Sequence, residues 1–205
     1  MREITYQEQF WKGQFGNEYV GRNADYTNMI AQNVSLFARI VDKVNGISSV
    51  IEYGSNIGMN LVALHYLLPK AELAAVEINE VAFSQLSKLE YVKPYNCSLV
   101  DFSKNAVYDF AFTKGVLIHL NPDILPQAYD VLFETSKRYI LIAEYYNPTP
   151  VEIRYRGNSS VLFKRDFAGE MLDRYSDLRL LDFGFTYHRV TPYNDDLNWF
   201  LLEKR

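Results

Sequence analysis

Apolar residues follow two different spacings along this chain, and each spacing predicts one kind of element. Helical spacing places apolar side chains every three or four positions, whereas strands are short runs rich in β-branched and aromatic residues. The expected helices cover residues 25–45, 57–68, 80–89, 121–137 and 167–175, and the expected strands cover 48–53, 72–78, 91–97, 107–113, 139–144, 178–187 and 197–203.

The order of these elements predicts an α/β fold. Strands alternate with helices as far as residue 144, which is typical of a parallel sheet with helices on both faces. The last two strands have no helix between them, so we expect them to pair antiparallel at one edge. Residues 145–165 are rich in Pro, Gly and Asn and predict a long irregular loop. No linker or repeat interrupts residues 1–205, so we expect one domain.

Composition excludes several classes of function. The single Cys and three His residues argue against a disulfide framework and against a zinc or other metal site. A net charge of −4 argues against nucleic acid as a partner. No long apolar segment and no signal sequence are present, which predicts a soluble, cytoplasmic protein without a membrane partner. The sequence leaves the oligomeric state open.

The first predicted strand leads into a glycine turn. Gly54 allows a sharp exit from the strand, and Gly58 lets the next helix approach a ligand closely. Glu77 follows the second strand, where an acidic side chain is well placed to accept hydrogen bonds from two ribose hydroxyls. A glycine turn plus an unrelated surface Glu is the alternative interpretation.

The same turn argues against a dinucleotide site. Asn56 and Met59 stand where a G-x-G-x-x-G sequence requires its second and third glycines, so the cradle for a pyrophosphate is incomplete. A nucleoside cofactor without pyrophosphate therefore fits better than NAD, which is kept as an alternative.

Two later segments suit the same cofactor. Asp101 is placed to accept from an adenine amino group and Phe102 to cover the base, although Asp101 is equally typical of a turn. Backbone carbonyls around Thr113, Lys114 and Gly115 are expected to face the amino-acid part of the cofactor.

These motifs, in this order, resemble the class I S-adenosylmethionine (SAM)-dependent methyltransferases over roughly residues 48–145. The resemblance implies a Rossmann-like, seven-stranded, mostly parallel sheet with the last strand inserted antiparallel. It also implies SAM as cofactor. The implied cofactor contacts are Tyr19, Arg22, Glu52, Gly54, Ser55, Asn56, Gly58, Glu77, Ile78, Asp101, Phe102, Thr113, Lys114 and Gly115.

The flanks are similar to the methylases associated with pseudaminic acid biosynthesis, a bacterial pathway of glycan modification. Residues 10–23, 144–148 and 155–169 carry this resemblance. It implies methyl transfer to a hydroxyl or amine of a small anionic amino sugar, such as pseudaminic acid or its CMP conjugate. Two alternatives stay open: a methyltransferase of another small metabolite or nucleotide-linked amino sugar, and a non-catalytic cofactor-binding partner in a glycan pathway.

His119 and Glu144 follow the fourth and fifth long strands and are the candidates for a general base. A packing role for His119 within its apolar run is the alternative. Arg22 is the candidate partner of the cofactor's carboxylate, because guanidinium binds carboxylate in a bidentate manner. Trp11 and Tyr19, in an N-terminal lid segment of residues 1–24, either cover the site or only dock a helix.

The 145–165 region is expected to face the acceptor. Its basic side chains suit a carboxylate or phosphate, and its Tyr and Asn side chains suit sugar hydroxyls, although a solvated charge cluster explains the basic residues equally well. The candidate substrate-binding residues are Tyr145, Tyr146, Asn147, Arg154, Tyr155, Arg156, Lys164 and Arg165.

Overall fold

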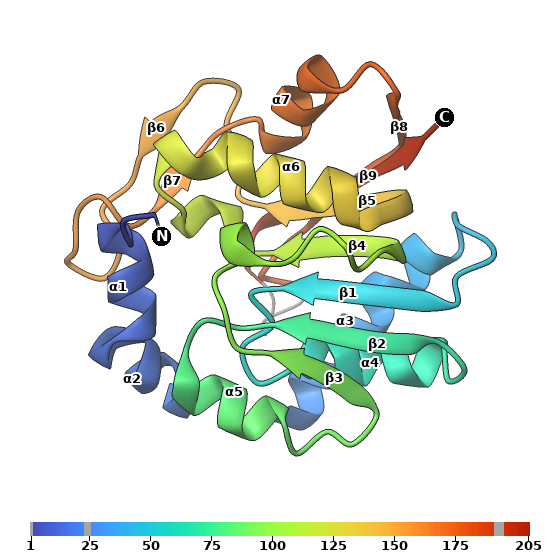
Figure 1. Cartoon of the computed structure of the whole chain (residues 1–205), viewed down its shortest axis with the longest axis horizontal. Helices are drawn as coiled ribbons and strands as arrows, with labels where there is room; N and C mark the ends of the chain where they lie inside the picture. Colours follow the sequence, from blue (N-terminus) through green and yellow to red (C-terminus); the bar gives the residue numbers. More distant parts are fainter. Residues whose placement is uncertain (1, 23–25, 191–194) are drawn as a thin grey trace.

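The computed structural model describes residues 2–22, 26–190 and 195–205 (Figure 1). The start of the helix expected from residue 25 and the end of the 1–24 segment lie outside these ranges. The helices are α1 (Tyr6–Lys12), α2 (Gln14–Arg22), α3 (Tyr26–Val41), α4 (Met59–Leu67), α5 (Glu80–Leu86), α6 (Leu125–Thr135) and α7 (Phe167–Arg174), with 3₁₀ turns η1 (Leu99–Asp101), η2 (Leu117–His119) and η3 (Pro122–Ile124). The strands are β1 (Ser49–Tyr53), β2 (Glu72–Val76), β3 (Val92–Tyr95), β4 (Tyr108–Lys114), β5 (Ser136–Glu144), β6 (Val151–Glu152), β7 (Phe163–Lys164), β8 (Leu178–Thr186) and β9 (Leu197–Lys204).

Seven strands form one sheet in the order β3-β2-β1-β4-β5-β9-β8. The first five are parallel, and β9 lies between β5 and β8, antiparallel to both. This arrangement confirms the predicted fold class and the antiparallel pairing of the two closing strands. The strand order reverses between β1 and β4, and ligands of open α/β sheets bind at such a point, beyond the carboxyl ends of the strands.

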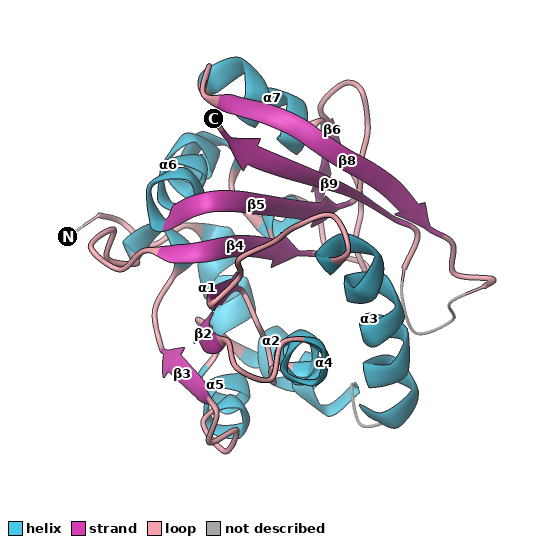
Figure 2. Cartoon of the chain, turned by 90° about the vertical axis from the view of Figure 1, so that its right-hand side faces the viewer, coloured by secondary structure: helices cyan, strands magenta, loops and turns pink. Residues whose placement is uncertain are grey.

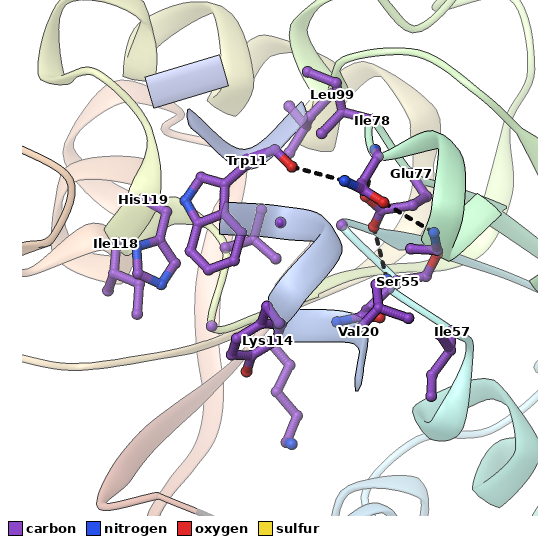
Figure 3. Close-up of a pocket in the computed structure, with 18 of the residues that line it drawn as sticks. Trp11, Val20, Ser55, Ile57, Glu77, Ile78, Leu99, Lys114, Ile118 and His119 are labelled. Carbon is purple, nitrogen blue, oxygen red and sulfur yellow. Dashed lines mark hydrogen bonds between the residues drawn. The ribbon is translucent and has the colours of Figure 1, made fainter. Parts of the chain in front are cut away.

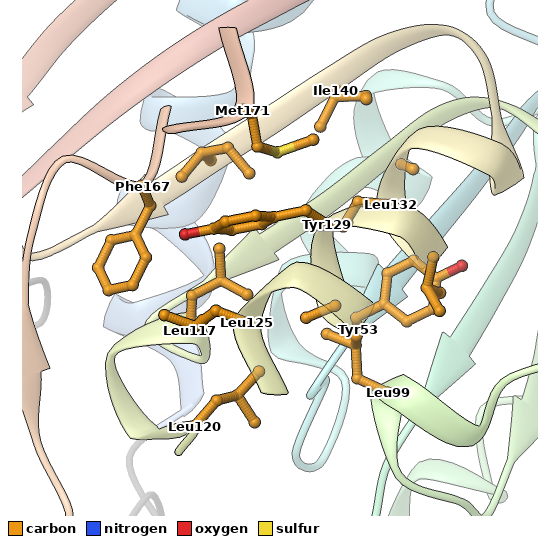
Figure 4. Packing of buried hydrophobic residues seen from close by; sticks show 14 of the residues in the cluster. Tyr53, Leu99, Leu117, Leu120, Leu125, Tyr129, Leu132, Ile140, Phe167 and Met171 are labelled. Carbon is orange, nitrogen blue, oxygen red and sulfur yellow. The ribbon is translucent and has the colours of Figure 1, made fainter. Parts of the chain in front are cut away.

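Helices cover both faces of the sheet because its central strands are buried on both sides (Figure 2). On one face, α3 and α4 bury Phe37 and Leu61 against Phe110 and Phe112. On the other face, α6 and α7 enclose a second core that includes Tyr129 (Figure 4). Within the described ranges, no helix combines the length and apolar character that crossing a membrane requires.

Two parts of the structure differ from the sequence-based expectation. The N-terminal segment folds into two helices, α1 and α2, and α1 begins at a capping box formed by Thr5 and Glu8. The 145–165 region is not wholly irregular, because β6 and β7 pair as a short antiparallel hairpin outside the main sheet. In Figure 1 both parts lie at the end of the sheet toward which the parallel strands point.

The turn after β1 depends on the backbone of Gly54. This residue has a φ of 71°, and an added Cβ would lie 2.5 Å from Cγ2 of Val116 in the loop after β4. Gly54 is therefore required both by its left-handed backbone and by the close approach of the two loops. Asn56 also has a positive φ, of 50°, which Asn tolerates better than most residues.

We predict that Gly54→Ala destabilises the fold more than Gly46→Ala does. Gly46 has nearly the same φ, 68°, but an added Cβ there has no atom within 4 Å. In both variants, Ala in the left-handed backbone conformation lowers the free energy of unfolding by about 1–2 kcal/mol. Only Gly54→Ala adds a steric clash, which lowers it by roughly 1–3 kcal/mol more. Urea unfolding of the two variants measures the difference. Equal free energies of unfolding would contradict the close contact with Val116.

Candidate functional site

A cavity of about 470 Å³ lies at the carboxyl edge of the sheet (Figure 3). Such a volume suits a small organic ligand. Its walls come from the loops after β1, β2, β3 and β4, and α1 and α2 close one side. The sequence-predicted residues that line it are Tyr19, Arg22, Gly54, Ser55, Asn56, Glu77, Ile78, Lys114, Gly115, His119, Tyr145, Tyr155 and Arg156.

Glu77 places a buried carboxylate in the cavity wall at the end of β2. Its Oε2 accepts the backbone N–H of Asn56 at 2.7 Å, and its Oε1 accepts that of Asn79 at 2.7 Å. Burial raises the pKa of Glu77, and these N–H donors oppose the shift. Each carboxylate oxygen has room for a further hydrogen bond. Glu77 can therefore hold the glycine turn and still accept two hydroxyl donors from a ligand.

Glu52, by contrast, does not line the cavity. It is fully enclosed below the turn, where Oε1 accepts Nδ2 of Asn60 at 2.6 Å. Burial raises its pKa to about 8, and the Asn60 donor and the nearby Lys114 ammonium oppose the shift. The predicted cofactor contact is therefore replaced by an indirect role: Glu52 positions Asn60, which does line the cavity.

Asp101 and Phe102 also lie away from the cavity. Phe102 packs into the core, 5.5 Å from the ring of Tyr53, and Asp101 accepts two hydrogen bonds from Arg2 at 2.8 and 2.9 Å. Neither residue therefore has the position that a contact with the adenine ring requires. Residues 97–99, just before them in the chain, line the cavity in their place.

Two separate sets of hydrogen bonds hold the N-terminal helix α1 beside the cavity. Arg2 bridges Asp101 and Glu8, and the Ser98 hydroxyl donates to Glu8. Burial opposes ionisation of Glu8, but the donors from Arg2 and Ser98 outweigh it and lower its pKa to about 2. At the other side, Gln7 Nε2 donates to the carbonyl of Ser160 at 2.7 Å.

His119 stands in the wall beside α1. Its Nδ1 lies 2.6 Å from the carbonyl oxygen of Val161, and its ring centroid is 4.5 Å from that of Trp11 and 5.2 Å from that of Tyr155. Burial lowers the pKa of His119 to about 4, so the ring is neutral at pH 7. Because a carbonyl can only accept, Nδ1 carries the proton and Nε2 has the free lone pair.

Glu144 is the other predicted base, and the structure places it outside the cavity lining. Its two carboxylate oxygens accept the backbone N–H groups of Val116, Leu117 and Ile118 at 3.0–3.3 Å. Burial raises its pKa to about 7 against the effect of these donors. Glu144 thus orders the loop that carries His119 and has no position from which to reach a ligand in the cavity.

The remaining predicted cofactor residues divide in the same way. Thr113 is buried inside the sheet, and Gly58 lies outside the lining, where an added Cβ would lie 2.7 Å from Leu89 Cδ1, whereas Lys114 and Gly115 line the cavity. Tyr19 and Arg22 line it from α2, and Arg22 lies at its rim, 3.6 Å from Glu18 and 5.3 Å above the ring of Phe15.

Only part of the 145–165 region reaches the cavity. Tyr145, Tyr155 and Arg156 line it, and the Tyr145 hydroxyl donates to Asp195 at 2.6 Å. The predicted residues outside the lining are Tyr146, Asn147, Arg154, Lys164 and Arg165. Arg165 instead pairs with Glu170 in α7, and Nζ of Lys164 lies over the Tyr145 ring, 5.2 Å from its centroid.

Several lining residues carry no recognisable sequence signal. Asn33 on α3 and Asp195 before β9 come from elements that the motifs do not cover. Asn79 is a helix cap whose side chain also donates to the carbonyl of Trp11 at 3.0 Å. A cap before α5 is predictable from the Asn type, but its contact with α1 is not. Among the described residues, no group of three or more His, Cys, Asp and Glu is arranged to hold a metal.

Comparison with known proteins shows which structures share this fold. The sequence matches no protein-family model and no curated protein. The structure is similar to magnesium protoporphyrin IX methyltransferase from Synechocystis PCC 6803 with bound SAM, with 12% identity, a TM-score of 0.71 and full coverage of both chains. It is also similar to 1,6-didemethyltoxoflavin-N1-methyltransferase from Burkholderia thailandensis with bound S-adenosylhomocysteine, with 13% identity, a TM-score of 0.71, and coverage of 100% of this chain and 92% of that one. A third is the plantazolicin methyltransferase in complex with S-adenosylhomocysteine and a pentazolic substrate analogue, with 14% identity, a TM-score of 0.65 and coverage of 97% and 95%. At these identities the similarity establishes the fold.

We predict that Glu52 makes stability fall as pH rises. Its pKa is about 8 in the folded chain against an ordinary 4.5. The contribution of protonated Glu52 to stability is therefore fully present below pH 4.5 and is lost as pH rises through 8. The slope from one such group is at most about 1.4 kcal/mol per pH unit. Glu52→Gln, which keeps an acceptor for Asn60, should flatten urea-unfolding stability across this window. Glu90→Gln, at an exposed position, is the control, and identical profiles for both variants would refute the assignment.

Proposed function

We propose that this protein is a SAM-dependent methyltransferase that acts on a small molecule. The observation that carries the proposal is Glu77, a buried carboxylate aimed into a cavity at the point where the strand order reverses. Two of its lone pairs accept backbone N–H groups, one from Asn56 in the turn after β1 and one from Asn79 after β2, and the rest suit the vicinal hydroxyls of a ribose.

The polar groups of the cavity fit such a cofactor. The side-chain oxygens of Asn56 and Asn60 are buried and have no hydrogen-bond donor among the described residues. Buried polar atoms without partners are rare and point to a missing ligand group. The turn also lacks the glycines that a pyrophosphate needs, which favours SAM over NAD.

For the acceptor, we propose a small anionic amino sugar such as pseudaminic acid or its CMP conjugate, as the sequence resemblance implies. Arg156 at the rim supplies positive charge, and Tyr145 and Tyr155 supply rings and hydroxyls. These groups match a carboxylate or phosphate next to sugar hydroxyls. Cytoplasmic location remains a prediction from the sequence.

The chemistry assigns His119 a defined task. When bound, the cofactor supplies a methyl group activated on a positively charged sulfur. The protein must align the acceptor, exclude water and, for a hydroxyl acceptor, remove a proton. Nε2 of His119 is the neutral site for that proton, while the Val161 carbonyl fixes the ring through Nδ1–H. Trp11 and Tyr155 flank the ring and shield it from solvent.

We predict that the purified protein binds SAM and S-adenosylhomocysteine but not NAD, and that Glu77→Gln weakens this binding at least about 10-fold. Calorimetric titration measures the affinities, with Glu80→Gln as control because Glu80 is exposed nearby at the start of α5. A 2′-deoxy analogue of the ligand separates ribose recognition from misfolding: the wild type should discriminate against it, and the variant should not. Binding of NAD alone, or of none of these ligands, would overturn the proposal.

We predict that His119→Asn lowers methyl transfer to a hydroxyl acceptor about 100- to 10,000-fold without changing the affinity for S-adenosylhomocysteine. His65→Asn, at a ring stacked on Tyr91 outside the cavity lining, is the matched control. Because the pKa of His119 is about 4, activity should fall only as pH drops toward 4.

A mass-spectrometric screen with pathway sugars supplies the acceptor for these assays. A decline in rate centred near the ordinary histidine pKa of about 6.5 would contradict the neutral, buried base. Cofactor binding with no transfer to any sugar or metabolite tested would favour the alternative of a non-catalytic binding partner.

A further inference from the structure

Lys114 ends β4 with its ammonium group in the cavity wall. Its side chain is half-buried, and in Figure 3 it extends away from Trp11 and His119. Within residues 2–22, 26–190 and 195–205, no hydrogen-bond or ion-pair partner lies against the Lys114 ammonium. A partly desolvated cation without a partner is costly to a fold.

The nearest acidic groups do not neutralise Lys114, because each is engaged elsewhere. Glu52 holds Asn60 and keeps its proton near neutral pH, and Asp195 accepts the Tyr145 hydroxyl. Glu144 accepts three backbone N–H groups of the loop after β4. Burial therefore lowers the pKa of Lys114 despite these acids. The local charge balance calls for an anion from outside the chain.

The cavity wall also contains acceptors that lack donors. The side-chain oxygens of Asn33 on α3 and Asn60 on α4 are buried, and no donor reaches them among the described residues. Both residues line the cavity together with Lys114. One ligand group supplies both missing partners: a zwitterion, with a carboxylate for the cation and an ammonium for the amide oxygens.

The position of Lys114 in the sheet agrees with such a ligand end. β1 separates β2, which leads to Glu77, from β4, which ends at Lys114. Neighbouring strands are about 4.8 Å apart, so a ligand anchored at Glu77 reaches Lys114 across roughly 10 Å, over the Gly54 turn. If the nucleoside part of the ligand binds at Glu77 after β2, its amino-acid part lies at the end of β4.

We propose that Lys114 binds the carboxylate of the cofactor's amino-acid end, and that the side-chain oxygens of Asn33 and Asn60 accept from its ammonium group. This assignment rests on the proposed cofactor. It replaces Arg22, the sequence-based candidate, whose guanidinium lies at the rim near Glu18 and over the Phe15 ring. An exposed guanidinium contributes less than a cation inside the cavity, where water screens the interaction less.

The test compares two ligands that differ at this end. S-adenosylhomocysteine carries the zwitterion, whereas 5′-methylthioadenosine keeps the nucleoside and the thioether and lacks it. We expect Lys114→Met to weaken binding of S-adenosylhomocysteine about 10- to 100-fold and to leave the affinity for 5′-methylthioadenosine unchanged. Lys114→Gln is a second, more polar variant, and Arg22→Met tests the rival assignment. Calorimetry gives the affinities, and thermal unfolding verifies that each variant is folded.

Each other outcome has a definite meaning. Equal loss of both ligands, or loss of neither, overturns the assignment of Lys114. Selective loss in Arg22→Met but not in either Lys114 variant returns the carboxylate to Arg22. If the wild type binds neither ligand, the proposed function itself fails, and that result is distinct from a failure at Lys114.

Discussion

Three buried carboxylates determine the shape of the carboxyl edge, because a buried carboxylate must find hydrogen-bond donors or lose its charge. Glu52 lies near the end of β1 and accepts a hydrogen bond from the side-chain amide of Asn60. Glu77 collects two backbone N–H groups from the loops after β1 and β2, and Glu144 collects three from the loop after β4. These acids therefore fix the loops after β1, β2 and β4, which form a large part of the cavity wall.

The same constraint separates Glu77 from Glu144, which look alike in sequence. Both are acidic residues at the carboxyl end of a parallel strand, but Glu144 is surrounded by backbone amides and lies outside the cavity lining, whereas Glu77 lines the cavity. Removing the Glu144 carboxylate would release the loop that carries His119 and Gly115. The Glu144 carboxylate thus acts on the position of this loop, and on His119 only through the loop.

Much of the fold could be predicted because sheet periodicity is a local property of the sequence. The strands of the main sheet and the antiparallel end follow from apolar spacing and from the lack of a helix between β8 and β9. Glu77 and the Gly54 turn could be predicted for the same reason, because each lies at the end of a predicted strand. The division of the chain into domains and the roles of individual site residues stay predictions.

The rest of the site could not be predicted because it depends on contacts between distant segments. Asp101 has the right position after β3, but Arg2, 99 residues away, takes both of its oxygens. In the sequence, the basic residues of the 145–165 region form one cluster. In the structure, Arg156 lines the cavity, whereas Arg154, two positions earlier on the same hairpin, lies outside the lining. No residue type or spacing reports such a division.

Trp11 connects the two halves of the cavity physically. Its carbonyl accepts from Asn79, the cap of α5 next to Glu77, while its ring packs on His119. Gly16 keeps α2 close, because a Cβ there would lie 1.8 Å from the Trp11 carbonyl oxygen. Docking of the N-terminal helices therefore sets the Glu77 side and the His119 side of the cavity at once. Because Trp11 contacts both sides, any change in how α1 docks moves the cap next to Glu77 and the wall at His119 together.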